Sequence, residues 1–145
     1  MNDKIRICVV DDEEIVCERL KQMLEKAGFT VDALTDSKNA LELISKKNID
    51  ILITDIKMGK PDGIDLLKYA RENSPETQVI IITGFATVET AKKAMKIGAV
   101  DFIAKPFRMG ELKSLVIKIA EESTKKHIAK FSGDNSDLAG SKTLG

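Results

Sequence analysis

The stretch Ile51-Leu52-Ile53-Thr54-Asp55 is a short apolar run that ends on a carboxylate. A run this short, with several β-branched side chains, is typical of a strand that is buried on both faces of a parallel sheet. In such sheets, ligands bind in the crevice beyond the carboxyl ends of the strands. We therefore expect Asp55 to lie at the ligand-binding edge of an α/β sheet.

The rest of the chain alternates between apolar stretches and segments whose apolar residues recur at helical spacing. Strands are expected at residues 5–10, 29–34, 49–54, 79–82 and 100–104. Each is followed by a predicted amphipathic helix, and the fifth helix is expected to run to about Lys130. This alternation predicts parallel strands joined by right-handed crossovers. The expected fold is a three-layer α/β sandwich with five strands and five helices.

The composition is that of one ordinary globular domain. The chain has 145 residues, 43% of them hydrophobic, and its 23 basic residues balance its 23 acidic residues. This balance argues against nucleic-acid binding by this chain, which requires a basic face. No apolar run approaches the roughly 18 residues of a membrane span, and residues 1–4 do not begin a signal peptide. We therefore expect a cytoplasmic protein without a membrane partner.

The two cysteines and the C-terminal end are interpreted as structural features. Cys8 and Cys17 do not have the spacing of a metal motif, and they are expected to be buried, reduced thiols. From Ser132 onward the sequence is rich in Gly, Ser, Asn and Asp. We expect a folded domain over residues 1–131 and a disordered tail or linker over 132–145.

Functional groups follow four of the five predicted strands. Asp11 and Asp12 follow the first, Asp55 the third, Thr83 the fourth and Lys105 the fifth. Carboxylates held close together raise one another's pKa values, and a divalent cation with oxygen ligands relieves their repulsion. The sequence therefore predicts a Mg²⁺ site at this edge, with Lys105 as a second compensating charge.

A metal ion, a lysine and a hydroxyl group around one carboxylate favour phosphoryl transfer onto that carboxylate. Aspartate is a covalent phosphoryl acceptor in several enzymes, and the transferred group needs positioning and support for the charge on its oxygens. Lys105 and the Thr83 hydroxyl group are the candidates for that support. The charged product next to them would pull the Thr83 loop toward Asp55, which is the behaviour of a switch.

Each of these residues also has an ordinary structural interpretation. Asp11 and Asp12 suit the positive end of a helix dipole, and Asp55 suits a turn. Thr83 suits the start of the fourth helix, and Lys105 suits a solvated loop. Together these interpretations require four coincidences at one edge of the sheet, so we favour the functional interpretation.

Five motifs, each at the end of a predicted strand or just beyond it, resemble those of the receiver domains of two-component response regulators. They are Val9-Val10-Asp11-Asp12-Glu13, Ile53-Thr54-Asp55-Ile56-Lys57-Met58, Pro61-Asp62-Gly63, Ile82-Thr83-Gly84 and Ala104-Lys105-Pro106-Phe107. The resemblance covers residues 4 to about 122. It implies a CheY-like, flavodoxin-like sheet with strand order 2-1-3-4-5.

The same resemblance implies a role for each residue at the metal site. Asp55 matches the phosphorylated residue of the family. Asp12 and Asp55 match the carboxylates that bind Mg²⁺ directly, together with the backbone carbonyl of Lys57. Asp11 matches the acid that holds a metal-bound water.

Further positions match the switch of the family. Thr83 corresponds to its switch hydroxyl and Lys105 to its phosphate-binding lysine, with a cis peptide bond expected at Lys105-Pro106. Phe102 corresponds to the switch aromatic residue. Residues 83–91 look most like receivers of NtrC-type transcriptional activators.

Three residues depart from the usual family pattern. Gly59 replaces a proline, which predicts a more mobile loop after Asp55. Lys57 and Phe85 occupy positions that tune loss of the phosphoryl group in the family, and neither is an obvious water-orienting residue. The sequence therefore predicts a long-lived phosphorylated form.

The leading hypothesis is a phosphorylation-activated switch that turns over no separate substrate. The resemblance implies a sensor histidine kinase as partner, an output domain in a longer protein, and a homodimer through the fourth helix, fifth strand and fifth helix. One alternative is a Mg²⁺-dependent phosphohydrolase of the haloacid dehalogenase type, but Lys57 stands where that superfamily has its second aspartate. Another alternative is a receiver-like binding module that is never phosphorylated.

Overall fold

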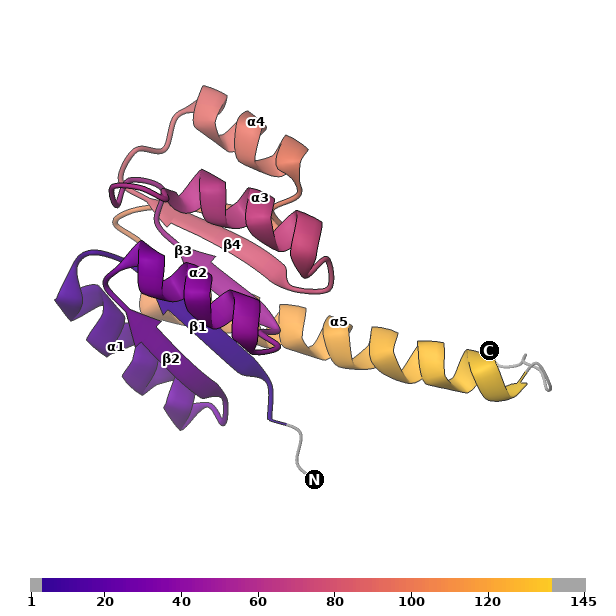
Figure 1. Cartoon of the computed structure of the whole chain (residues 1–145). Coiled ribbons are helices and arrows are strands. Elements are labelled where there is room, and N and C mark those ends of the chain that lie inside the picture. Colours follow the sequence, from indigo (N-terminus) through magenta and orange to yellow (C-terminus); the bar gives the residue numbers. More distant parts are fainter. Residues whose placement is uncertain (1–3, 137–145) are drawn as a thin grey trace. The chain divides into compact units, whose positions relative to one another are not determined.

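The computed structural model describes residues 4–136, which form a parallel sheet and five helices (Figure 1). The strands are β1 (Arg6–Val10), β2 (Thr30–Leu34), β3 (Ile51–Thr54), β4 (Gln78–Thr83) and β5 (Asp101–Ala104). The helices are α1 (Glu14–Lys26), α2 (Ser37–Lys46), α3 (Gly63–Asn73), α4 (Val88–Ile97) and α5 (Met109–Ser136). The sheet order is β2-β1-β3-β4-β5, and all four pairings are parallel, which confirms the predicted fold class.

The central strands are buried on both faces, as expected of a sheet between two helical layers. Alternate strand residues, such as Cys8, Leu52 and Ile81, join one hydrophobic cluster with buried residues of α2, α3 and α4. The residues between them point to the opposite face, because side chains alternate along a strand. Helix α1 packs beside β1 and β2 and buries Cys17, Leu20 and Leu24.

The helices of the layer formed by α2, α3 and α4 begin at side-chain caps. The Asp36 carboxylate accepts a hydrogen bond from Lys38 N at 2.8 Å. Capping boxes start α3, between Asp62 and Asp65, and α4, between Thr87 and Thr90. Such caps satisfy backbone N–H groups that have no partner inside the helix. Because Thr87 is the cap of α4, Thr83 is available for another role.

The structure differs from the sequence prediction at the C-terminal end. Helix α5 continues to Ser136, past the end expected near Lys130 and into the predicted tail. Backbone hydrogen bonding extends a helix without an apolar stripe once the helix has been nucleated. The remainder of the tail, residues 137–145, lies outside the described residues, and the domain boundary after residue 131 stays a prediction. Residues up to Lys113 form one compact unit, and α5 from Ser114 belongs to a second.

Both cysteines are free and buried, as the sequence predicts. Burial raises the pKa of Cys8 to about 12 and that of Cys17 to about 11, so both thiols stay protonated near neutral pH. Within residues 4–136, no helix is long and apolar enough to cross a membrane.

Candidate functional site

The carboxyl ends of β1, β3, β4 and β5 bring the predicted functional residues to one edge of the sheet. Residues in register include Val10 with Thr54, and Thr83 with Ala104. One carboxylate oxygen from each of Asp11, Asp12 and Asp55 lies within 4.8 Å of the others. Residues separated by more than forty positions therefore form one acidic cluster.

Lys105 lies within this cluster. Its ammonium group is 2.6 Å from Asp11 Oδ2 and 3.0 Å from Asp55 Oδ2. The Lys105 side chain is 15% exposed, and that of Asp11 is fully buried. Lys105 is therefore an ion-pair partner of two buried carboxylates and not a solvated loop lysine.

The pKa values at this site reflect burial and pairing together. Burial raises the pKa of Asp11, although its hydrogen bonds with Lys105 and with the Glu13 N–H group act in the opposite direction. For Lys105, burial alone would lower the pKa, but the hydrogen bonds to Asp11 and Asp55 outweigh it and the pKa is raised. The lysine therefore stays charged, and it is the cation that compensates the buried acids.

Backbone N–H groups fix the two buried carboxylates from the opposite side. Glu13 N donates to Asp11 Oδ1 at 2.9 Å, and Ile56 N donates to Asp55 Oδ1 at 2.6 Å. Each carboxylate thus has one oxygen on a backbone N–H group and the other on Lys105. Asp12 is exposed, so the cluster faces solvent on its side. Three carboxylates in this arrangement are a donor set that suits a hard divalent cation.

Thr83 is fully buried at the end of β4, next to the start of the loop that carries Lys105. Lys105 N donates to the Thr83 carbonyl at 2.9 Å. The Thr83 hydroxyl oxygen accepts a hydrogen bond from Phe85 N at 3.0 Å. Because this bond occupies a lone pair of Thr83 Oγ1, the hydroxyl proton remains free to donate.

The other predicted residues lie around this centre. Lys57 is exposed, and its ammonium group lies 4.1 Å from the centroid of the Phe85 ring. Phe102, on β5, is partly buried and packs against the hydrophobic cluster of the sheet. The Lys105–Pro106 peptide bond is cis, and so is Lys60–Pro61.

Gly63, in the Pro61-Asp62-Gly63 motif, is also part of the site. A Cβ atom on Gly63 would lie 2.8 Å from Ile56 Cα and closer still to the Asp55 carbonyl oxygen. Gly63 N also donates to the Ile56 carbonyl at 2.8 Å. The start of α3 is therefore packed directly on the backbone of Asp55, and only glycine allows this approach. The signal in the sequence is the Asp62-Gly63 pair at the start of the helix.

Glu13 is a second residue whose contact the sequence analysis missed. Its carboxylate lies 3.6 Å from the Lys105 ammonium group, and its side chain is 60% exposed. The run Asp11-Asp12-Glu13 is the only signal for it in the sequence. Because Glu13 is exposed to solvent, its ion pair with Lys105 contributes less to stability than the pairs of Lys105 with Asp11 and Asp55.

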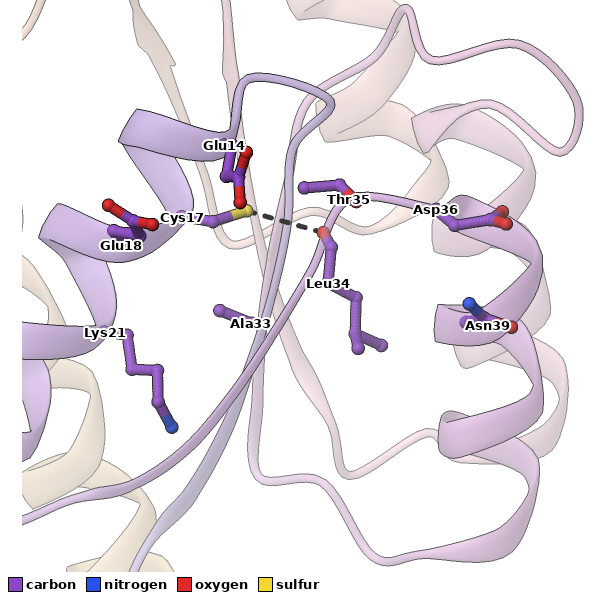
Figure 2. A pocket seen from close by; sticks show the side chains of 9 residues that line it. All are labelled: Glu14, Cys17, Glu18, Lys21, Ala33, Leu34, Thr35, Asp36 and Asn39. Carbon is purple, nitrogen blue, oxygen red and sulfur yellow. Dashed lines mark hydrogen bonds between the residues drawn. The ribbon is translucent and has the colours of Figure 1, made fainter.

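A hollow of about 320 Å³ lies beside this site, between α1 and the segment from β2 to α2 (Figure 2). Cys17 lines it, and its sulfur points toward the Leu34 carbonyl oxygen at 3.5 Å (Figure 2). None of Asp12, Asp55 and Lys105 lines this hollow. The hollow is therefore distinct from the centre formed by Asp12, Asp55 and Lys105.

Comparison with known proteins shows the family to which a chain with this acidic cluster and this fold belongs. A family model for the response regulator receiver domain matches residues 7–117. The chain belongs to this family. This result confirms the resemblance that the five motifs carry.

The relatives of this receiver domain include regulators of the NtrC type, as residues 83–91 predict. Regulatory protein AtoC of Escherichia coli (strain K12) is 37% identical over 124 residues, which cover 85% of this chain and 27% of AtoC. Transcriptional regulatory protein ZraR of the same strain is 34% identical over 117 residues, covering 81% of this chain and 26% of ZraR. The receiver domain thus spans about a quarter of the length of these relatives.

Solved structures show the same fold. A CheY-like receiver domain protein from Methanospirillum hungatei JF-1 has a TM-score of 0.82 and 27% identity, covering 86% of this chain and 99% of that one. A response regulator protein from Burkholderia pseudomallei, solved with a phosphorylated aspartic acid, calcium ion and citrate, has a TM-score of 0.72 and 26% identity. The match covers 92% of this chain and 75% of the Burkholderia pseudomallei chain.

Proposed function

We propose that this receiver domain is a switch controlled by phosphorylation of Asp55 in a two-component system. The phosphoryl group comes from a phosphohistidine of a sensor histidine kinase, and the reaction depends on Mg²⁺. The observation that carries the proposal is the position of Lys105, which pairs with Asp55 and Asp11 inside a cluster of three acids. The regulators with which this chain shares its family support the same function.

The donor set fits Mg²⁺, which prefers oxygen ligands and keeps several waters. Asp12, Asp55 and the Lys57 carbonyl would hold the ion, and Asp11 would hold it through a water. When bound, the ion would supply positive charge to the oxygens of the transferred group.

The chain's own residues carry the transfer. An oxygen of Asp55 attacks phosphorus, the bond from phosphorus to the histidine nitrogen breaks, and the imidazole leaves with that electron pair. Lys105 already lies 3.0 Å from Asp55 Oδ2, so its charge is in place for the phosphoryl oxygens. The Thr83 hydroxyl proton, which is free to donate, supports another of these oxygens.

The switch follows from the charge of the product. A phosphoryl group adds nearly two negative charges beside Thr83 and Lys105 and draws the Thr83 hydroxyl group toward it. Movement of the segment after β4 changes the packing around Phe102, which is partly buried on the neighbouring strand. The change then reaches the surfaces of α4, β5 and α5, where a second receiver domain would bind.

Receiver domains act in signalling, and we propose that this one turns over no separate substrate and works in the cytoplasm. In the longer relatives, the sequence beyond the match leaves room for an output domain. We propose that such a domain reads the state of Asp55 in the full-length protein. Nucleic-acid and membrane binding are not expected of the receiver domain itself.

The test is an intact-mass measurement after incubation with acetyl phosphate and Mg²⁺. The wild-type chain is expected to gain one phosphoryl group, and Asp55→Asn is expected to gain none. Chelation of Mg²⁺ should abolish the gain. A wild-type chain that stays unmodified, or an Asp55→Asn chain that is modified equally, would refute the proposal.

A further inference from the structure

A second hollow, of about 300 Å³, lies between α3 and α4, and none of Asp11, Asp12 and Asp55 lines it. Helices α3 and α4 are neighbours in the layer that covers one face of the sheet (Figure 1). Ile56 and Ile64, each only 8% exposed, give the hollow an apolar wall. This α3–α4 hollow is therefore a separate feature from the proposed phosphorylation site.

Lysines from three segments line the α3–α4 hollow. Lys60 precedes α3, Lys68 lies on α3 and Lys93 lies on α4. Asp62 and Asp65 line it as well, so three positive charges face two negative charges. A hollow whose lining carries a net positive charge attracts an anionic ligand.

The two acids of the hollow already have partners. Asp62 N donates to Asp65 Oδ2 at 2.9 Å, and Asp65 N donates to Asp62 Oδ1 at 2.8 Å, which forms the capping box of α3. The Lys60 ammonium group lies 3.4 Å from Asp65 Oδ2 and 3.9 Å from Asp62 Oδ2. Lys60 therefore balances the acids at the start of α3, and the other two lysines are not needed for this purpose.

Lys68 and Lys93 lack a counter-ion. Within the described residues, the ammonium group of neither lysine forms an ion pair or a hydrogen bond. They lie on different helices, so one anion in the hollow can be bound from both sides. Residues in the first turns of α3 and α4, Asp65 and Thr90, also line the hollow, and the positive ends of both helix dipoles add to the attraction.

We propose that the α3–α4 hollow binds a phosphate monoester of a small molecule. The phosphate group pairs with the ammonium groups of Lys68 and Lys93, since lysine binds phosphate as a point charge. The organic part of the ligand packs against Ile56 and Ile64. A volume of about 300 Å³ is at the lower end of the range for ligand sites, which suits an organic part of about one ring. Binding is noncovalent and does not depend on phosphorylation of Asp55.

The exposure of the two lysines sets the size of the effect. Lys68 and Lys93 are exposed to solvent. An exposed ion pair contributes little free energy, so loss of either lysine should weaken binding by about two- to fivefold. The affinity should also fall as the salt concentration rises, because exposed charges are screened.

The test is an NMR titration of the isotope-labelled chain with phenyl phosphate, without acetyl phosphate or Mg²⁺. We expect saturable shifts of the amide signals of Ile56, Lys68 and Lys93. Lys68→Gln and Lys93→Gln should each raise the Kd for phenyl phosphate by about two- to fivefold. Lys92→Gln is the matched control, because Lys92 is an exposed lysine of the same helix that does not line the hollow, and its Kd should stay close to that of the wild type.

Two further probes separate the parts of the ligand. Phenol carries the ring without the phosphate and should cause no saturable shift at Lys68 or Lys93; a shift as large as that of phenyl phosphate would overturn the role of the phosphate group. Inorganic phosphate carries the charge without the ring and should bind more weakly than phenyl phosphate. Equal affinities would overturn the role of Ile56 and Ile64.

Three results with phenyl phosphate would each overturn the inference as a whole. They are the absence of a saturable shift, shifts confined to Thr83 and Lys105, and a loss of affinity in Lys92→Gln as large as that in Lys93→Gln. A chain that binds phenyl phosphate in the hollow but gains no phosphoryl group from acetyl phosphate and Mg²⁺ would refute the proposed function alone, so the two failures are distinguishable.

Discussion

Replacing Lys105 with methionine should destabilise the protein in a manner that depends on pH. Lys105→Met keeps the apolar stem but removes the cation that lies 2.6 Å from the fully buried carboxylate of Asp11. Removing one partner of a buried ion pair costs about 3–5 kcal/mol, because the other charge stays buried without compensation. We expect a loss of that order near pH 8.

The loss should become smaller in acid. Without Lys105, burial raises the pKa of Asp11 further above its value in the unfolded chain. An acid of this kind binds its proton more tightly in the folded state, so stability falls as the pH rises through the folded pKa. Near pH 5, more Asp11 is protonated and less of the 3–5 kcal/mol penalty remains.

Urea unfolding followed by far-UV circular dichroism measures the effect, since the chain contains no tryptophan. Lys68→Met is the control, and an exposed substitution of this kind changes stability by about 0.5 kcal/mol or less. Added Mg²⁺ should restore part of the stability of Lys105→Met, because it binds only the folded acids. A Lys105→Met variant with wild-type stability at pH 8, or with an equal loss at both pH values, would refute this account of the site.

Three further predictions concern neighbouring features. Gly63→Ala places a methyl group against the Asp55 carbonyl. We expect the free energy of unfolding in urea to fall by about 1–3 kcal/mol and phosphorylation to be slower. An unchanged rate of phosphorylation would contradict the close approach of Gly63 to Asp55. Burial raises the pKa of Cys17 to about 11; because unfolded thiols ionise first, stability should fall as the pH rises from about 9 toward 11, and Cys17→Ala should fall less steeply. The phosphorylated form should decay slowly, because neither Lys57 nor Phe85 is an obvious water-orienting residue; a lifetime of seconds in a mass time course would count against this prediction.

The sheet and the members of the acidic cluster could be predicted because they depend on local patterns. Asp11, Asp55 and Lys105 each stand directly after a strand, and the parallel pairing of these strands brings the three residues to one edge of the sheet. The end of α5 could not be predicted in this way, because a helix continues by backbone hydrogen bonding after its apolar pattern ends.

Contacts between loops could not be predicted from the sequence for a different reason. The ring of Phe85 meets Lys57 across two loops that no periodicity relates, and the packing of Gly63 on Asp55 depends on the path of the chain between them. The order of the strands places the functional side chains at the correct edge of the sheet. The hydrogen-bond partner of each oxygen and each N–H group depends on the folded path of the backbone, which the sequence pattern does not give.

The ion pair between Asp11 and Lys105 also bears on when the protein becomes competent to signal. The two residues are 94 positions apart, and Lys105 follows the last strand of the sheet. A ribosome-bound chain that has not yet emerged through β5 has an Asp55 but lacks the amine that faces it. On the proposed function, Asp55 would become a usable phosphoryl acceptor only after synthesis of the whole sheet, because the ammonium group that pairs with it belongs to a residue beyond the last strand.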